Sequence, residues 1–347
     1  FGRKAAMLAA GGSEDLAGMG QVYLRITVLF SPLLFVLAVN SDTLRNEGRV
    51  GFMAAMSLLV SLANIGFNYV LIARLDMGVA GSAYGTAMAQ SLGLAIITIF
   101  RFRGTTILRL SALRHHRMTH SWGRILALGA PQSLNFIGIA LGSAAIMAAL
   151  QIVNSPSYEA TVSAYGIITR VLTFAYLPLL GLSHAMQTIT GNNFGAGQWL
   201  RSNNSLKLAI VTAFAYCATL QFAMTLFAEQ IGAAFVDDPV VIAEVSRILP
   251  VIVALFFLAG PLMMIAAFFQ AIGDAGRAAL LGFSKPYLFA IPLTFTFAGT
   301  MGEIGIWTAG PVAEALLLVL TAAVLARTAR IGSLRWGVFH SIAEERT

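Results

Sequence analysis

Long apolar runs separated by short stretches rich in glycine, proline and charge set the pattern of this chain. Each run has about 20 residues or more, the length an α-helix needs to cross the hydrocarbon core of a bilayer. The runs are apolar all round rather than in strict alternation, and lipid offers no partner for a free peptide group, so helices are favoured over a barrel. The predicted fold class is all-α, a polytopic membrane protein with about nine spans. These lie at 21–40, 50–73, 78–100, 123–152, 160–190, 205–228, 243–270, 278–300 and 302–326.

The composition agrees with this pattern. Hydrophobic residues make up 58% of the chain and charged residues 11%, against roughly 45 to 50% and 25% in soluble domains. Cys217, the only cysteine, lies in an apolar run, so we expect neither a disulfide framework nor a thiolate metal site within the chain. The sequence contains no HExxH or GxSxG motif and no paired carboxylates within a span, so we expect neither an enzyme nor a cofactor.

The net charge of +7 would favour nucleic acid only if the basic residues lay on a soluble surface. Instead they concentrate in alternate connections between spans, and the other connections hold most of the acidic residues. The positive-inside rule explains this asymmetry without a nucleic-acid partner. It predicts that the connection 101–122 and the C-terminus lie in the cytoplasm, with the bacterial inner membrane as the expected location. The basic connections contain Arg45, Arg49, Arg101, Arg103, Arg109, Arg114, Arg117, Arg124, Arg201, Lys207, Arg277, Lys285, Arg327, Arg330 and Arg335.

Two short motifs recur at nearly the same spacing. LRNEGR at 44–49 matches IGDAGR at 272–277, and both are expected to form glycine turns. GVAGSAYGTAMAQ at 78–90 matches GEIGIWTAGPVAE at 302–314. Parallel halves need an even number of spans each, and six per half satisfies this. The second half then begins near Trp122, and we expect about three further spans to precede the first residue of the present chain.

The joint order of several motifs resembles the multidrug and toxic compound extrusion (MATE) transporters over essentially the whole chain. These motifs are YLRI at 23–26, LRNEG at 44–48, NIGFNY at 64–69, GVAGSAYGTAMAQ at 78–90, LGAPQS at 128–133, Tyr165 and Arg170 through Pro178 and Gly181, GNNFGAGQ at 191–198, QAIGDAGR at 270–277 and GIW at 305–307.

The resemblance implies two six-helix bundles around a central cavity. Residues 1–100 would form spans four to six of the first bundle, 101–122 a cytoplasmic linker, 123–330 the second bundle and 331–347 a cytoplasmic tail. It also implies export of drugs or metabolites by rocker-switch exchange for H+ or Na+. Family members often carry acidic coupling residues in spans one, seven or ten, but 131–151 and 245–272 contain no Asp or Glu. The coupling site therefore needs another candidate.

Glu314 is that candidate, because an ionisable group inside a span is costly and usually functional. It follows Pro311, which lacks an N–H and so frees a carbonyl that could help to bind a cation. Arg170 could hold the Glu314 charge or bind an anionic substrate, and His184 could titrate near neutral pH. Arg170, Phe174, Leu177, Gly181, His184 and Thr188 share one helical face, which we expect to look into the bundle. For each residue a structural role stays open as the alternative.

Polar and aromatic residues within the spans supply candidates for a substrate cavity. They suit lipophilic or cationic molecules through cation-π contacts and hydrogen bonds, although packing between helices is an equally simple role for each. The candidates are Gln132, Asn135, Phe136, Tyr165, Phe174, Tyr176, Asn64 and Asn68.

The leading hypothesis is thus a monomeric, cation-coupled exporter of lipophilic or cationic small molecules. The alternative is a flippase for lipid-linked oligosaccharide or peptidoglycan precursors. Such a flippase would need several cationic residues in its cavity, where this chain offers mainly Arg170.

Overall fold

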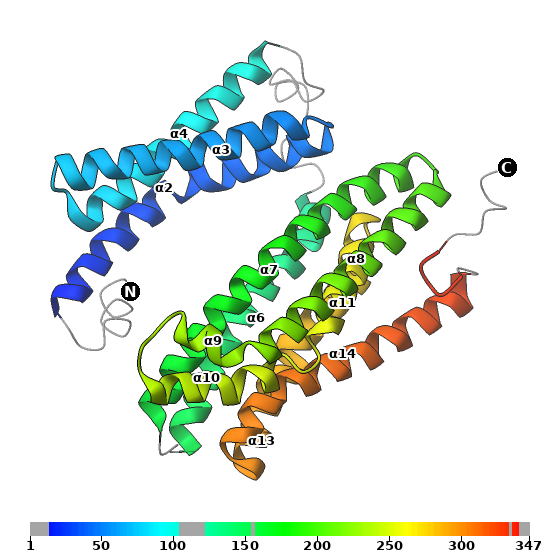
Figure 1. The fold of residues 1–347 in the computed structure, drawn as a ribbon. Helices are drawn as coiled ribbons and strands as arrows, with labels where there is room; N and C mark the ends of the chain where they lie inside the picture. The colour runs from blue at the N-terminus through cyan, green and yellow to red at the C-terminus, as the bar shows by residue number, and fades with distance from the viewer. Residues whose placement is uncertain (1–13, 104–121, 154–156, 333–334, 340–347) are drawn as a thin grey trace. The chain divides into compact units, whose positions relative to one another are not determined.

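The computed structural model describes residues 14–103, 122–153, 157–332 and 335–339 (Figure 1). Apart from an antiparallel bridge between Arg335 and Phe339, regular structure in these ranges is helical. The elements are α2 (Glu14–Asn46), α3 (Val50–Asn68), the π-helical segment η1 (Tyr69–Arg74), α4 (Gly78–Phe102), α6 (Trp122–Val153), α7 (Tyr158–Gly195), α8 (Trp199–Leu226), α9 (Ala228–Ala233), α10 (Pro239–Ile252), α11 (Phe256–Ala271), α12 (Ala275–Phe283), the π-helical segment η2 (Ser284–Ala290), α13 (Ile291–Met301) and α14 (Glu303–Gly332).

Eight helices of the described chain are long and apolar enough to cross a membrane, and a bent pair raises the number to nine. The predicted all-α fold with about nine spans is therefore confirmed. The predicted span 243–270 consists of two helices, α10 and α11, which meet at a bend of 49°. The span predicted at 278–300 comprises α12, η2 and α13. Most of the predicted linker 101–122 and tail 331–347 lies outside the described residues.

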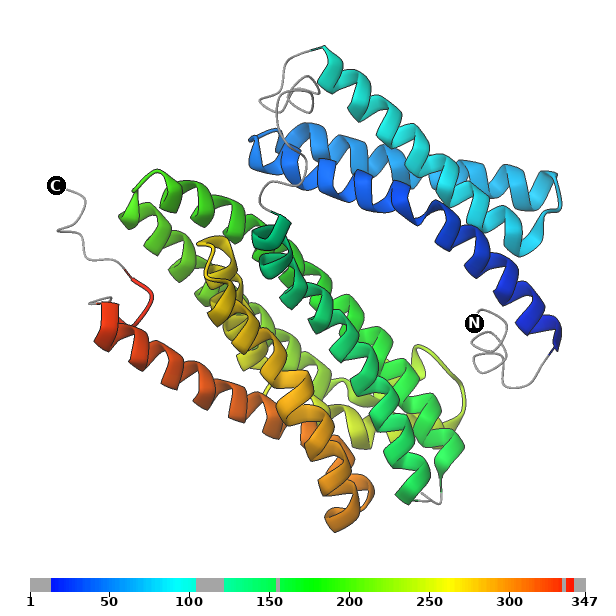
Figure 2. The ribbon, with the colours of Figure 1, turned by 180° about the vertical axis from the view of Figure 1, so that it is seen from behind.

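The chain divides into two compact units, Phe1–His120 and Ser121–Thr347. In the first unit α4 packs against both α2 and α3, and Figure 2 shows the three helices from behind. The α4 face that makes these contacts is lined by small buried residues, among them Gly81, Gly85 and Gly93. A Cβ atom added at Gly85 would lie 2.1 Å from Oδ1 of Asn68. Small side chains thus let α3 and α4 approach closely, as in other membrane helix pairs.

Polar contacts also join the helices of the first unit. The Asn64 amide donates to Oγ1 of Thr86 at 3.0 Å. At the other end, Arg101 forms a buried ion pair of 3.1 Å with Glu47 and donates through Nε to Oδ1 of Asn40 at 2.8 Å. The LRNEGR motif therefore contributes more than a turn. Gly48 has the positive φ of 77° that the turn requires, and Glu47 binds α4.

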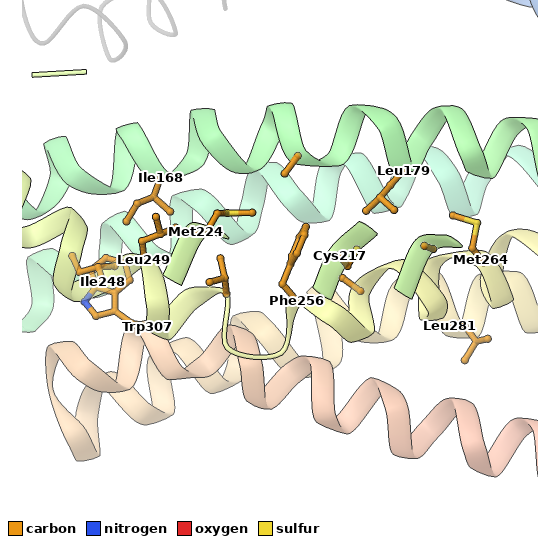
Figure 3. Close-up of a cluster of buried hydrophobic side chains, with 14 of the residues drawn as sticks. Ile168, Leu179, Cys217, Met224, Ile248, Leu249, Phe256, Met264, Leu281 and Trp307 are labelled. Atoms are coloured by element: carbon orange, nitrogen blue, oxygen red, sulfur yellow. The ribbon is translucent and has the colours of Figure 1, made fainter. Parts of the chain in front are cut away.

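In the second unit, α7, α8, α10, α11, α12 and α14 surround one continuous apolar core (Figure 3). Trp307, Phe268 and Leu249 are among its largest fully buried side chains. Helices α8 and α11 pack closely, and a Cβ at Gly260 would lie 2.8 Å from the Ala213 carbonyl oxygen. Cys217 lies in this contact and is completely buried.

The bend between α10 and α11 has a specific polar support from α8. The side chain of Gln221 donates to the Ala254 carbonyl oxygen at 2.7 Å and accepts from the Phe257 N–H at 3.0 Å. A broken helix leaves backbone groups without intrahelical partners, and in an apolar setting these groups need others. Gln221 satisfies one carbonyl and one N–H at once.

We therefore expect Gln221→Leu to lower the free energy of unfolding by about 1 to 3 kcal/mol, because it removes two hydrogen bonds that each contribute about 0.5 to 1.5 kcal/mol. Thermal unfolding of the purified protein in detergent measures this effect. Gln230→Leu, at an exposed position of α9, is the control. Equal unfolding temperatures for Gln221→Leu and the unmodified protein would mean that the bend needs no side-chain support.

Candidate functional site

Glu314 lies in the middle of α14 and is paired with Lys285 of η2. The carboxylate oxygen Oε2 contacts the Lys285 Nζ. The Glu314 side chain is 7% exposed, whereas that of Lys285 is 33% exposed. The pair therefore borders an accessible region on the lysine side and is enclosed by the bundle on the glutamate side.

Tyr176 of α7 completes this group of three, which we call the Glu314 triad. Its hydroxyl lies close to the Lys285 ammonium, and its ring packs edge-on against Phe256 of α11 at a centroid distance of 5.4 Å. The triad thus joins α7, η2 and α14 through polar groups within an apolar bundle. Lys285 and Pro286 lie in the π-helical segment η2, a rare geometry that occurs frequently at functional sites.

The expectation that Arg170 holds the Glu314 charge is wrong, because Lys285 does so. The charge pattern of the sequence assigned Lys285 to a basic connection, but the structure places it inside the candidate span Ala275–Met301. The available signal was a lone lysine followed by proline within a long apolar run. Its partner could not be assigned from spacing, because the two residues lie on different helices.

The face of α7 that carries Arg170 also differs from expectation. Arg170, Phe174 and His184 are exposed on the surface of the second unit rather than directed into its bundle. The opposite face, with Ala164, Ile168, Ala175, Leu179 and Met186, fills the core instead. That opposite face carries no charged side chain, so it enters the apolar core without the cost of burying a charge.

The remaining cavity candidates fall into three places. Gln132 and Asn135 are half-buried on α6, and Phe136 beside them is 54% exposed. Tyr165 of α7 is half-buried, with its ring 5.8 Å from Trp307 and its hydroxyl 3.4 Å from Oγ of Ser143.

Asn64 and Asn68 belong to the first unit, where the Asn68 amide donates to Oδ1 of Asn64 at 3.3 Å. Through Thr86 this chain of amides ties α3 to α4, which is the packing role that the sequence left open.

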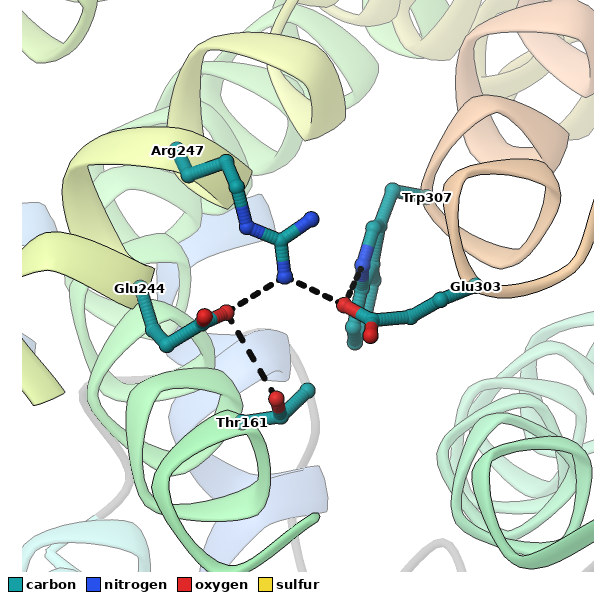
Figure 4. A network of polar contacts seen from close by, with 5 residues as sticks. All are labelled: Thr161, Glu244, Arg247, Glu303 and Trp307. Atoms are coloured by element: carbon teal, nitrogen blue, oxygen red, sulfur yellow. Dashed lines mark hydrogen bonds and ion pairs between the residues drawn. The ribbon is translucent and has the colours of Figure 1, made fainter. Parts of the chain in front are cut away.

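A second polar network, which the sequence pattern did not predict, lies where α7, α10 and α14 meet (Figure 4). Arg247 of α10 bridges the carboxylates of Glu244 and Glu303. Glu303 also accepts from the Trp307 indole N–H at 3.1 Å, and Thr161 contacts Glu244 at 3.5 Å. This network connects three helices of one unit, so we interpret it as a structural tie.

Comparisons with known proteins agree with this architecture. Residues 1–70 and 131–296 match the family model described as MatE. An FAD transporter from Shewanella oneidensis is 23% identical over 314 residues, which are 88% of this chain and 68% of that protein. Multidrug and toxin extrusion protein 2 from Oryctolagus cuniculus is 24% identical over 83% of this chain and 47% of its own length. The chain thus spans about half to two thirds of these relatives.

Solved structures show the same fold. A transporter of the MOP superfamily from Pyrococcus furiosus superposes with a TM-score of 0.82 at 20% identity, covering 92% of this chain and 71% of that one. A MATE transporter in complex with MaD3S gives the same TM-score at 20% identity and covers 99% of this chain. Because the family model matches more than half of the chain and the fold agrees, the chain belongs to the MatE family of membrane transporters, as its motifs predicted.

Proposed function

We propose that this protein is a secondary antiporter that exports small organic molecules in exchange for H+ or Na+, with Glu314 as the coupling carboxylate. The observation that supports this is the Glu314 triad, a buried carboxylate held by a partly exposed ammonium inside an apolar bundle. Ionisable groups in such a setting are costly and mark ion pathways.

The triad offers a simple way to couple an ion to a conformational change. A proton on Glu314, or a sodium ion beside it, takes the place of the Lys285 ammonium as the counter-charge of the carboxylate. Lysine carries its charge on a flexible four-carbon stem, so the released ammonium can move toward the accessible side. The two pairings stabilise different arrangements of α7, η2 and α14, and the ion gradient biases the populations of those arrangements.

The relatives, judged by their names, carry small organic molecules of more than one kind, and this supports a similar range of cargo for the present protein. They include extrusion proteins for multiple drugs and a transporter of FAD. The exposed aromatic side chains Phe136 and Phe174 suit the lipophilic part of such molecules. Exchange by a rocker-switch motion is what the family resemblance implies.

The proposal also places the protein in the bacterial inner membrane as a monomer, with the connection 101–122 and the C-terminus in the cytoplasm. The excess of basic residues in alternate connections supports this orientation.

Transport by reconstituted protein in liposomes tests the coupling role. We expect ethidium or riboflavin 5′-phosphate (FMN) to move against its gradient when a pH or sodium gradient is imposed, and Glu314→Gln to reduce this movement to the level of empty liposomes. The amide keeps the size of the side chain but carries no charge to exchange. Glu229→Gln, at an exposed position of α9, is the matched control.

Two outcomes would contradict the proposal. Transport at the same rate with and without a pH or sodium gradient would rule out the antiport mechanism. Gradient-driven transport that Glu314→Gln leaves unchanged would remove Glu314 from the coupling role.

A further inference from the structure

A guanidinium group lies exposed on an apolar helix of the second unit, several turns from either end of that helix. Arg170 is the thirteenth residue of α7, roughly 18 Å along the helix axis from Tyr158. The helix belongs to a candidate membrane span, and Arg170 is exposed on its surface. A charged side chain directed at lipid is costly, so such residues almost always face a bundle interior or a water-filled path. Because Arg170 is not in the core of its own bundle, we assign it to a water-filled path.

Arg170 also lacks the counter-charge that several other charged residues within the spans have. Asp42, Glu244 and Glu314 are each ion-paired. Among the residues that the structure describes, no carboxylate lies within ion-pair distance of Arg170. This face of α7 therefore presents an uncompensated positive charge. A cationic cargo would be repelled there and an anionic one attracted.

Phe174 gives this face a second recognition element. It follows Arg170 by one helical turn, so both side chains lie on the same side of α7. Phe174 is 70% exposed, and Leu177, one step further along the face, is 54% exposed. A planar guanidinium binds phosphate or carboxylate with two parallel hydrogen bonds, and a neighbouring phenyl ring can stack on an aromatic group.

We propose that Arg170 and Phe174 form a substrate-binding site for aromatic anions, in which the guanidinium binds a phosphate or carboxylate and the phenyl ring packs against the aromatic part. This inference rests on the proposed transport function, because it names the class of substrate. It does not depend on the coupling role of Glu314. It replaces the expectation of a cationic cargo with an anionic one.

Equilibrium binding to the purified protein in detergent tests the site without any ion gradient. FMN and riboflavin are matched probes, since they share one fluorescent ring system and differ by a phosphate. We expect FMN to bind more tightly than riboflavin. Arg170→Gln should weaken FMN binding by about tenfold while leaving riboflavin unchanged, as expected for the loss of charge-assisted hydrogen bonds. Arg170→Lys should bind FMN more tightly than Arg170→Gln but less tightly than the unmodified protein, because lysine keeps the charge but not the planar fork.

Matched variants separate the contribution of the phenyl ring from that of the guanidinium charge. Phe174→Leu should weaken the binding of FMN and of riboflavin to the same extent, since it removes the stacking ring and leaves the charge in place. Glu229→Gln, at an exposed position of α9, should leave the binding of both probes unchanged. Arg201→Gln, in the first turn of α8, where the guanidinium contacts Gln198, controls for general loss of positive charge.

Equal affinity of the unmodified protein for FMN and riboflavin would overturn the proposal. So would an equal loss of affinity for both probes in Arg170→Gln. Tighter binding of ethidium to Arg170→Gln than to the unmodified protein, without loss of FMN binding, would assign the face to cations instead.

Discussion

Replacing Lys285 by methionine is expected to lower the free energy of unfolding by about 3 kcal/mol. Removing one partner of a buried ion pair costs roughly 3 to 5 kcal/mol because the other charge stays buried without compensation. The low end applies here, since one third of the Lys285 side chain is exposed. Glu314, which is almost fully enclosed, would be the stranded charge. Tyr176 would also lose its contact with the ammonium.

The double variant Lys285→Met with Glu314→Leu provides the decisive comparison. It removes both charges, and apolar side chains commonly replace a buried ion pair at little cost. We expect it to recover most of the lost stability. If the double variant were as unstable as Lys285→Met, shape rather than charge would explain the loss.

The protein carries its own probe for this measurement. Cys217 is the only cysteine of the chain and is completely buried between α8 and α11. A thiol-reactive dye that becomes fluorescent on reaction therefore reports unfolding of the second unit during a temperature ramp. Cys217 would need no substitution, and the same dye serves every variant.

Gly305→Ala is expected to have the second largest effect, a loss of about 3 kcal/mol, the upper range for forcing an extra group into a packed site. Gly305 lies in the first turn of α14, where that helix turns back against α13. A Cβ added there would lie 2.2 Å from the Phe297 carbonyl oxygen and 2.6 Å from its carbonyl carbon. Both are backbone atoms, so the helices themselves would have to separate.

Gly310→Ala is the matched control on the same helix. Nothing lies within 4 Å of the position that its Cβ would occupy. Alanine is a better helix former than glycine by about 1 kcal/mol, so this variant should unfold at the same temperature as the unmodified protein or slightly above it. Similar behaviour of the two alanine variants would show that α13 and α14 do not approach as closely as described.

The hydropathy pattern of the chain was sufficient to predict the fold class and the span positions, and its motifs predicted the family. These properties are local, because a peptide group in lipid must be satisfied within its own helix whatever surrounds it. The same argument singled out Glu314, since an isolated carboxylate in an apolar run is conspicuous without knowledge of its neighbours. The glycine turn expected at LRNEGR was also predicted from the sequence, and Gly48 adopts the positive φ that such a turn requires.

The partners of these residues were decided only in three dimensions. Hydropathy cannot tell which face of an apolar helix meets another helix, and so Arg170 was expected in the core where Ala164 and Leu179 lie. Nor can it pair Lys285 with Glu314, which are 29 positions apart on different helices, or place the Gln221 amide at a bend in another span. Burial of a face and pairing of charges depend on how helices pack, and packing is a property of the assembled bundle.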